Sequence, residues 1–152
     1  MRILTLHCKT LTYTPDAPSV TAAQLPEADI GTPVDLGECL YALVCVQEGD
    51  DPATARRAAK GLRRIARHNA AKKIAINAFA HLAPDLADAQ TTQDVVDVLA
   101  ERLEASPEWD VVKMPYGWRK CWQMEVYPSE WAQRAIHEPP SRPRPADVRE
   151  AR

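Results

Sequence analysis

Glycine is scarce in this chain, with five residues among 152. Neither a Gly-x-Gly-x-x-Gly fingerprint nor a phosphate-binding loop occurs, so nucleotide hydrolysis and dinucleotide binding lack support. A Gly-x-Ser-x-Gly motif is also absent, and no cysteine lies in a motif that marks a nucleophile, which argues against covalent catalysis. Direct attack by water is the simplest enzymatic mechanism left.

Long apolar runs are also missing. The longest, around residues 40–46 and 95–99, fall far short of the roughly 20 residues that span a bilayer. The N-terminus has no sustained apolar stretch ending in a small-residue cleavage site, so secretion is not expected. We therefore expect a cytoplasmic protein without a membrane-spanning helix.

Paired cysteines are the third absence. The four cysteines form no Cys-x-x-Cys pair, and in the cytoplasm such scattered residues are expected to be reduced thiols. Three of them lie in apolar or alternating runs, where cysteine usually behaves as a small core residue. The sequence predicts no metal site and no cofactor.

The composition is that of one compact domain. The formal net charge is -2 and 45% of the residues are apolar, which excludes an acidic disordered chain and a histone-like polycation. Any nucleic-acid contact must come from a local patch. We expect one domain over residues 1–137 and a disordered Pro/Arg-rich tail over residues 138–152, because the tail has few apolar residues to bury.

Strand-like and helical segments alternate along the domain. Residues 2–13 predict a strand, a turn and a second strand, and residues 14–37 a long loop rich in Pro and Gly. The run 39–47 predicts a central strand buried on both faces, and further strands are expected at 73–79, 109–114 and 120–127, the last two joined at Pro115-Tyr116-Gly117. Asp51 and Pro52 open a helix that runs to about His68, and Thr91 or Thr92 caps a second helix.

These elements predict a fold of the mixed α/β (α+β) class, with a mixed β-sheet or barrel core and two main helices. The second helix has an apolar stripe of Val95, Val96, Leu99 and Leu103. A small domain rich in sheet gains by covering its edges, which favours a dimer.

The first helix has a basic face. It consists of Arg56, Lys60, Arg63 and Arg67. No acidic residue occurs between positions 52 and 73, so no partner within the helix neutralises these charges. Two interpretations have equal weight: the face binds a phosphate backbone, or it is an ordinary solvated face.

Two ionisable residues lie beside predicted strand ends in apolar surroundings. His81 can donate or accept a proton or fix a water molecule near neutral pH, or it can satisfy backbone carbonyls in a turn. Lys120 can orient an attacking water or stabilise an oxyanion, or it can form a salt bridge with solvent-facing carboxylates. Neither residue alone identifies a reaction.

Three tracts, taken in order, resemble the editing domain of archaeal-type threonyl-tRNA synthetases. They are Met1-Arg2-Ile3-Leu4-Thr5-Leu6-His7-Cys8, Ala78-Phe79-Ala80-His81-Leu82 and Pro115-Tyr116-Gly117-Trp118-Arg119-Lys120. The resemblance covers roughly residues 1–136. It implies the fold of the D-aminoacyl-tRNA deacylases, a homodimer, and hydrolysis of serine wrongly attached to threonine tRNA. Such editing is needed because one methyl group gives a synthetase pocket only about 1–3 kcal/mol of discrimination.

The resemblance also implies roles for individual residues. Lys120 and His81 are expected to be catalytic. The residues expected to bind the substrate are His7, Val44, Cys45, Phe79, Ala80, Tyr116 and Glu130. From their charge, and not from the resemblance, we expect contacts with tRNA at Arg56, Lys60, Arg63, Arg67 and Arg119, with Arg142 and Arg144 in the tail.

Three departures from the family pattern qualify these expectations. Arg119 stands where the family usually has an aromatic residue, and the segment near Tyr127–Trp131 aligns with a short deletion, which makes Glu130 the nearest candidate for the family's glutamate. The chain also stops where a full synthetase continues into its aminoacylating core. We therefore expect a proofreading hydrolase that acts in trans on tRNA(Thr), beside a threonyl-tRNA synthetase without its own editing domain, and that cannot charge tRNA itself.

Two alternatives stay open. The substrate is D-aminoacyl-tRNA or another mischarged tRNA, or the chain is a non-catalytic module that binds tRNA or a synthetase.

Overall fold

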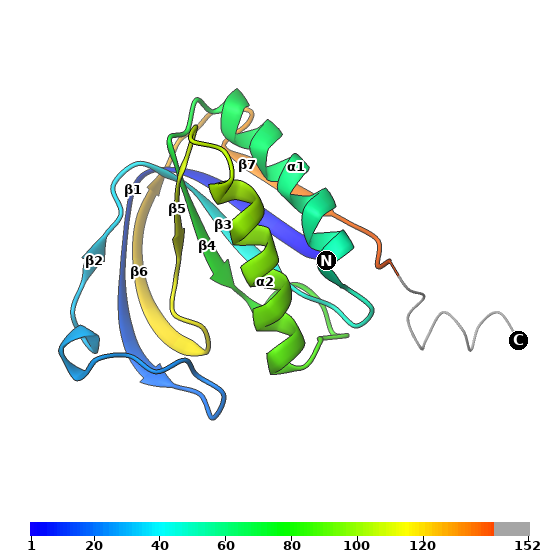
Figure 1. Ribbon diagram of the computed structural model, residues 1–152. Coiled ribbons are helices and arrows are strands. Elements are labelled where there is room, and N and C mark those ends of the chain that lie inside the picture. Colours follow the sequence, from blue (N-terminus) through cyan, green and yellow to red (C-terminus); the bar gives the residue numbers. More distant parts are fainter. Residues whose placement is uncertain (142–152) are drawn as a thin grey trace, which may run out of the picture.

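A curled mixed sheet with two long helices on one face forms the protein, as the computed structural model of residues 1–141 shows (Figure 1). The strands are β1 (Arg2–Pro18), β2 (Val34–Asp35), β3 (Cys39–Cys45), β4 (Lys73–Ala78), β5 (Asp110–Lys113), β6 (Trp118–Val126) and β7 (Gln133–His137). The helices are α1 (Pro52–His68) and α2 (Ala89–Glu104), with single 3-10 turns η1 (Glu27–Asp29) and η2 (Ala80–Leu82). The predicted α+β class is confirmed.

Strand β1 pairs with four of the other six strands. Its first half pairs antiparallel with β3 and with β7, and its second half pairs with β2 and with β6. Its pairing with β6 shifts register between Cys8 and Thr10 and again between Pro15 and Ala17, and such bulges let a strand bend. The second half of β1 and β6 thus curl away from the helices (Figure 1).

The hairpin predicted over residues 2–13 is wrong. Lys9 and Thr10 are two exposed residues in succession between the buried Cys8 and Leu11. They interrupt the alternation as a turn would, but they belong to the first bulge of one continuous strand. The following loop accordingly starts later than predicted, after Pro18.

Strand β3 lies at the centre, as predicted, and all seven of its residues are buried. Leu40, Ala42 and Val44 pack beneath the helices. Cys39, Tyr41 and Leu43 face the concave side of the sheet. Strands β4 and β5 continue the sheet in parallel from β3, so the polypeptide between these strands crosses over through α1 and α2.

Helix α1 has the predicted limits. The Asp51 carboxylate accepts hydrogen bonds from the backbone N–H groups of Ala53 and Thr54 at 2.9 and 3.1 Å, and Thr54 Oγ1 accepts one from the backbone N–H of Asp51 at 3.3 Å. This reciprocal cap satisfies donors that the first turn leaves unpaired. Gly61 lets the helix approach β7, since a Cβ there would lie 3.0 Å from Ile136.

The cap predicted for the second helix is wrong by three residues or more. Asp88 caps α2, accepting hydrogen bonds from the backbone and the hydroxyl of Thr91 at 2.8 and 2.9 Å. Thr91 therefore stabilises the first turn from inside the helix. The predicted apolar stripe of this helix is confirmed, since all four of its residues are buried.

Strands β5 and β6 follow one another through the turn at Pro115–Gly117, but they do not pair with each other. Strand β5 pairs with β4, and β6 pairs with β1. Strand β6 therefore runs along the concave side, opposite β4. This arrangement brings Lys120 on β6 next to Asn77 on β4, although the two residues are 43 positions apart in the sequence.

The last described residues lie along the start of α1. Arg57 Nε is 3.2 Å from a carboxylate oxygen of Glu138, and Arg57 also donates to the carbonyl of Pro139 at 2.7 Å. The rest of the predicted tail, with Arg142 and Arg144, lies outside the described residues. No helix within residues 1–141 is long and apolar enough to cross a membrane.

We expect Asp51→Ala to lower the free energy of unfolding by about 1–2 kcal/mol, because two backbone N–H groups of α1 lose their acceptor. Urea denaturation followed by circular dichroism measures this change. Asp16→Ala is the control, since Asp16 is exposed; equal stability of the two variants would contradict the proposed strength of the cap.

Candidate active site

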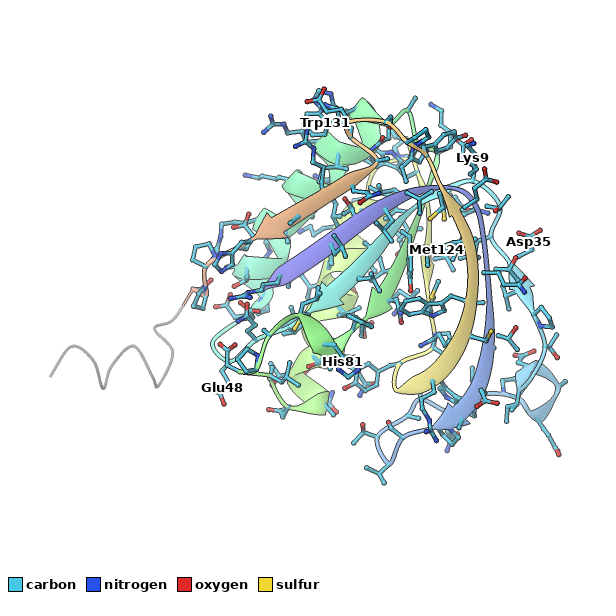
Figure 2. The ribbon with its side chains drawn as sticks, turned by 180° about the vertical axis from the view of Figure 1, so that it is seen from behind. Lys9, Asp35, Glu48, His81, Met124 and Trp131 are labelled. Carbon is cyan, nitrogen blue, oxygen red and sulfur yellow. The ribbon has the colours of Figure 1, made fainter. Side chains whose placement is uncertain are left out.

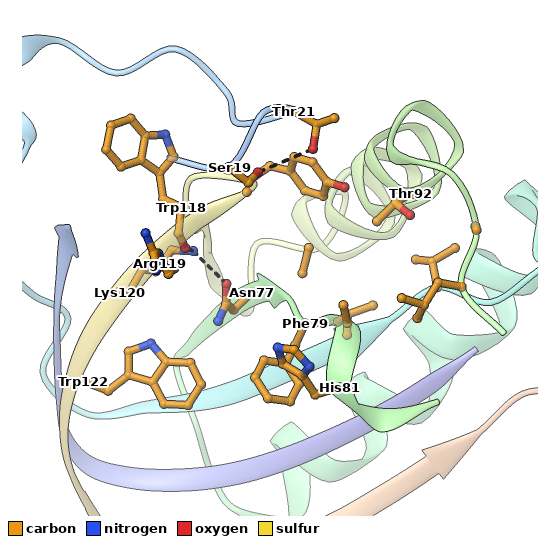
Figure 3. Close-up of a pocket in the computed structure, with 18 residues that line it drawn as sticks. Ser19, Thr21, Asn77, Phe79, His81, Thr92, Trp118, Arg119, Lys120 and Trp122 are labelled. Atoms are coloured by element: carbon orange, nitrogen blue, oxygen red, sulfur yellow. Dashed lines mark hydrogen bonds between the residues drawn. The ribbon is translucent and has the colours of Figure 1, made fainter. Parts of the chain in front are cut away.

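A cavity of about 590 Å³ lies where the end of β4, η2, the first turns of α2 and the start of β6 meet. Figure 3 shows the side chains around it. It is lined by Ser19, Thr21, Val44, Val46, Asn77, Ala78, Phe79, Ala80, His81, Leu86, Ala87, Thr92, Tyr116, Gly117, Trp118, Arg119, Lys120 and Trp122. The two tracts that sequence analysis singled out, residues 78–82 and 115–120, thus form opposite parts of one cavity.

Lys120 lies on β6 and is partly buried at the cavity wall. Its Nζ donates hydrogen bonds to the carbonyl oxygen of Trp118 at 2.9 Å and to Oδ1 of Asn77 at 3.2 Å. No carboxylate within residues 1–141 forms a salt bridge with it. The salt bridge offered as an alternative role for this lysine is therefore not found in the described part of the chain.

Burial lowers the pKa of Lys120 to about 8, because an ammonium loses hydration there without gaining an opposite charge. Both protonation states are then accessible near neutral pH. The two acceptors hold two N–H groups, so the ammonium has a third donor left for the cavity. The neutral amine has a lone pair left in that place, and either form can contact a water molecule or a substrate oxygen.

His81 lies on η2, directly after β4, and is exposed (Figure 2). Its ring lies nearly perpendicular to the ring of Phe79, at a centroid distance of 5.1 Å and an angle of 79°. Phe79 is anchored by its backbone N–H, which donates to the Val44 carbonyl at 2.8 Å. Within residues 1–141 the imidazole makes no hydrogen bond, so the backbone-satisfying role considered for it is not observed there.

Four of the residues expected to bind substrate line the cavity. They are Val44, Phe79, Ala80 and Tyr116. Arg119, expected to contact tRNA, also lines it and is exposed. The cavity therefore brings together five of these expectations with the two catalytic ones.

The structure places His7, Cys45 and Glu130 elsewhere. His7 is buried beside Tyr127, with a ring centroid distance of 4.4 Å, and its Nε2 is 3.6 Å from the Glu38 carboxylate. Cys45 is buried at the end of β3, and this burial raises the pKa of its thiol. The Glu130 side chain is 85% exposed and 3.5 Å from Arg134.

Glu130 also lies far from His81. Its neighbour Trp131 is at the opposite end of the molecule (Figure 2), where the indole stacks on His68 at 3.7 Å. The segment with the altered alignment is thus remote from the cavity. Neither Glu130 nor His7 nor Cys45 contributes to the cavity lining.

The basic face of α1 is partly engaged with other elements. Arg67 forms a two-pronged ion pair with Glu108 at 2.8 and 3.1 Å, and Arg63 donates to the carbonyl of Arg102. Arg56 and Lys60 are exposed and make no ion pair within the described residues. The partners of Arg63 and Arg67 come from α2 and from the loop after it, so the acid-free sequence of the helix did not reveal them.

Sequence analysis missed several polar residues of the site. Asn77 interrupts the apolar strand Ile74–Ala75–Ile76, a signal that could have been read. Ser19 and Thr21 belong to the loop after β1, which folds onto the turn before β6: Gly117 has φ +73°, and a Cβ there would lie 2.7 Å from Ala22. That contact joins segments that are distant in the chain, so no local sequence pattern predicts it.

A metal-dependent mechanism has no ligand set in the described part of the chain. No group of three or more His, Cys, Asp or Glu residues within residues 1–141 could hold a metal ion. The polar side chains that line the cavity carry an amine, an imidazole, a guanidinium, an amide and hydroxyl groups.

Comparison with known proteins adds to this geometry. A family model of the archaea-specific editing domain of threonyl-tRNA synthetase matches residues 1–134. Among curated proteins, the threonine–tRNA ligase of Cenarchaeum symbiosum is 33% identical over 126 residues, and that of Nitrosopumilus maritimus is 29% identical over 126 residues. Each match covers 83% of the chain, but the chain spans only about a fifth of these relatives, 19% and 20% of their lengths.

Among solved structures, the c-Myc DNA Unwinding Element Binding Protein superposes with a TM-score of 0.66. The alignment covers 91% of this chain and 99% of that protein, with 10% sequence identity. At this identity the likeness concerns the fold alone.

We expect Lys120 to titrate near pH 8 in the folded protein, well below the usual lysine value of 10.5. The ¹³Cε and ¹Hε resonances of the lysines, assigned by comparison with Lys120→Met, follow this titration directly. Lys113, which is exposed and 2.6 Å from Asp97, is an internal control without that burial. A midpoint above pH 10 for Lys120 would show that its ammonium stays hydrated.

Proposed function

The chain belongs to the family of archaea-specific editing domains of threonyl-tRNA synthetase, and from this premise we propose that it hydrolyses L-seryl-tRNA(Thr) by attack of water on the aminoacyl ester. Family membership supports an editing hydrolase of aminoacyl-tRNA. The observation that carries the proposal is that Lys120 and His81, from β6 and from the turn after β4, line the same cavity.

Lys120 supplies the electrostatic part of the reaction. Water attacks the ester carbonyl carbon, and the carbonyl oxygen becomes an oxyanion in the tetrahedral intermediate. The third N–H of the Lys120 ammonium, the one left free by Trp118 and Asn77, stabilises that charge. Collapse of the intermediate breaks the bond to the ribose oxygen, which takes up the proton that the water gave to His81 and leaves serine and free tRNA.

His81 holds the attacking water. Both nitrogens of its exposed imidazole are free of hydrogen bonds within the described residues, so one can accept a hydrogen bond from the water as the other faces solvent. Its ring is steadied by the edge contact with Phe79. An imidazole also accepts the proton that the water loses on attack.

The substrate contacts are assigned to the four predicted residues that line the cavity, Val44, Phe79, Ala80 and Tyr116. Serine and threonine differ by one methyl group, so a wall in van der Waals contact with the serine side chain leaves no room for that methyl group. Such a wall reproduces, in the opposite sense, the discrimination of about 1–3 kcal/mol that a synthesis site achieves.

We further propose that the protein acts in trans, on aminoacyl-tRNA charged by a separate threonyl-tRNA synthetase. In this proposal it works in the cytoplasm and as a homodimer. The exposed Arg56 and Lys60 of α1 support contact with tRNA phosphates, because no acidic residue within the described part of the chain neutralises them. Arg63 and Arg67 contribute less to that contact, since both have partners within the protein.

A non-catalytic binding module is the second candidate, and Arg119 favours it. This exposed guanidinium stands at the cavity beside Lys120, where the family usually has an aromatic residue, and it suits a phosphate better than an ester carbonyl. A protein of this kind binds tRNA and leaves the seryl ester intact. Hydrolysis of D-aminoacyl esters in preference to L-seryl esters would instead change the substrate and keep the site.

We expect rapid hydrolysis of seryl-tRNA(Thr) and slow hydrolysis of threonyl-tRNA(Thr), and a loss of about 100-fold or more in kcat for Lys120→Met, because the variant keeps the shape of the side chain and removes the oxyanion donor. Single-turnover deacylation with radiolabelled aminoacyl-tRNA measures both.

Lys113→Met is the matched control, since it removes an exposed lysine outside the cavity. Hydrolysis by the Lys120→Met protein at the rate of the unaltered chain would remove Lys120 from the mechanism. Binding without hydrolysis of any ester by the unaltered chain would establish the binding module.

We expect Arg56→Ala/Lys60→Ala to lower kcat/KM about 10-fold at low salt and to reduce the slope of log(kcat/KM) against log[salt] by about 1–2, because two phosphate contacts are lost. The control is Lys9→Ala/Lys113→Ala, which removes the same charge from lysines paired with Glu125 and Asp97. Equal salt slopes for the two double variants would show that α1 does not face the tRNA.

A further inference from the structure

Asn77 is the most buried polar side chain in contact with Lys120. It lies on β4, is 3% exposed, and lines the cavity. Both ends of its amide are engaged: Nδ2 donates to the hydroxyl of Tyr41 at 2.9 Å, and Oδ1 accepts from Lys120 Nζ at 3.2 Å (Figure 3). The residue therefore connects the centre of the sheet to the lysine on the strand that crosses over it.

Tyr41 sets the direction of this amide. Its side chain is fully buried on β3, and burial raises its pKa, so the hydroxyl stays neutral over the range in which lysine titrates. Its ring is fixed by an edge contact with Trp122 at 5.5 Å and 87°. With Nδ2 of Asn77 committed to this hydroxyl, Oδ1 points at Lys120.

The surroundings of Lys120 carry no negative charge. Among residues 1–141, the cavity lining contains no Asp or Glu, and its ionisable groups besides Lys120 are His81, Tyr116 and Arg119. The two hydrogen-bond acceptors of Nζ, the Trp118 carbonyl and the Asn77 amide, are both neutral. The lysine is thus held by dipoles and not by an ion pair.

We propose that Asn77 is a positioning residue for the hydrolysis: its side-chain oxygen, together with the Trp118 carbonyl, aims the Lys120 amine at the substrate ester without introducing a negative charge. The inference rests on the proposed function, because it assigns Asn77 a role through Lys120. It goes beyond that function by placing the geometry and the protonation of the amine under the control of a residue on a different strand.

The type of residue matters at this position. An aspartate would pair with the ammonium, favour its charged form and compete with the oxyanion for its protons. A leucine of similar size would leave one N–H of Lys120 without an acceptor and let the flexible side chain leave the productive direction. Asparagine supplies the acceptor and avoids the charge.

Three variants and one control separate these roles. Asn77→Leu removes the side-chain oxygen that accepts from Lys120, and Asn77→Asp adds a negative charge beside the amine. Tyr41→Phe keeps Asn77 but removes the hydroxyl to which its Nδ2 donates. Ile76→Val, a change on the helix-facing side of the same strand, is the control for packing. Each protein is measured for the NMR titration of Lys120, the kcat and KM of seryl-tRNA(Thr) hydrolysis, and the alkaline limb of the pH–rate profile.

We expect Asn77→Asp to raise the titration midpoint of Lys120 by roughly one to three pH units and to move the alkaline limb in the same direction. We expect Asn77→Leu to lower kcat about 10- to 100-fold, with KM within about two-fold. Tyr41→Phe should give a smaller loss of kcat, and Ile76→Val should leave the midpoint and kcat unchanged.

The two proposals fail in different ways. A Lys120 midpoint unmoved in Asn77→Asp, or a kcat in Asn77→Leu equal to that of Ile76→Val, would overturn the role of Asn77 even if the unaltered chain hydrolyses seryl-tRNA. A chain that hydrolyses no ester would overturn the proposed function, and with it the positioning role, even where the titration shift shows that Asn77 contacts the amine. If Asn77→Leu does not fold, Asn77→Asp and Tyr41→Phe still test the inference through the same readouts.

Discussion

The pairing of β1 with four other strands is the constraint on which the rest of the structure depends. Its first half holds β3 and β7 under the helices, and its second half, bent by two bulges, holds β2 and β6. Because β6 follows that bend, it runs opposite β4 and not beside β5. Lys120 reaches Asn77 only through this path. A straight β1 would leave the lysine on an open sheet edge in water.

Burial without a counter-charge is the second consequence of that path. Most buried charges are paired, whereas Lys120 is held by an amide oxygen and a carbonyl oxygen and its pKa falls to about 8. The folded protein therefore binds fewer protons than the unfolded chain between about pH 8 and 10.5, so this group makes stability rise with pH in that window. Below pH 8 the ammonium is retained at a cost to stability.

Local patterns in the sequence were sufficient for much of the fold. The apolar run of β3 and the Asp51-Pro52 start of α1 each depend on residues close together in the chain, and both predictions are confirmed. The predicted hairpin was wrong because Lys9 and Thr10 look like a turn, whereas β6 pairs with Cys8 and with Thr10 and leaves Lys9 as the bulge between them. The cap of α2 was misplaced because several polar residues precede the helix and the sequence does not show which one bonds to the backbone.

The candidate site was predictable only to the extent that its residues lie in recognisable tracts. Residues 78–82 and 115–120 could be named, but their meeting, and the part played by Asn77, depend on tertiary structure. Glu130 shows the limit of such tracts. It was named only as the nearest acidic residue in a segment that aligns with a deletion, and its neighbour Trp131 lies far from His81 in the structure.

The position of Arg119 follows from the same strand geometry. Successive residues on a strand point to opposite faces, and along β6 the exposed positions Arg119, Cys121 and Gln123 alternate with the less exposed Lys120 and Trp122. Arg119 therefore cannot take the place of Lys120 beside Asn77, and its charge is directed to the outer face and rim. The charge of Arg119 thus bears on what approaches the cavity mouth, and Lys120 keeps its place beside Asn77.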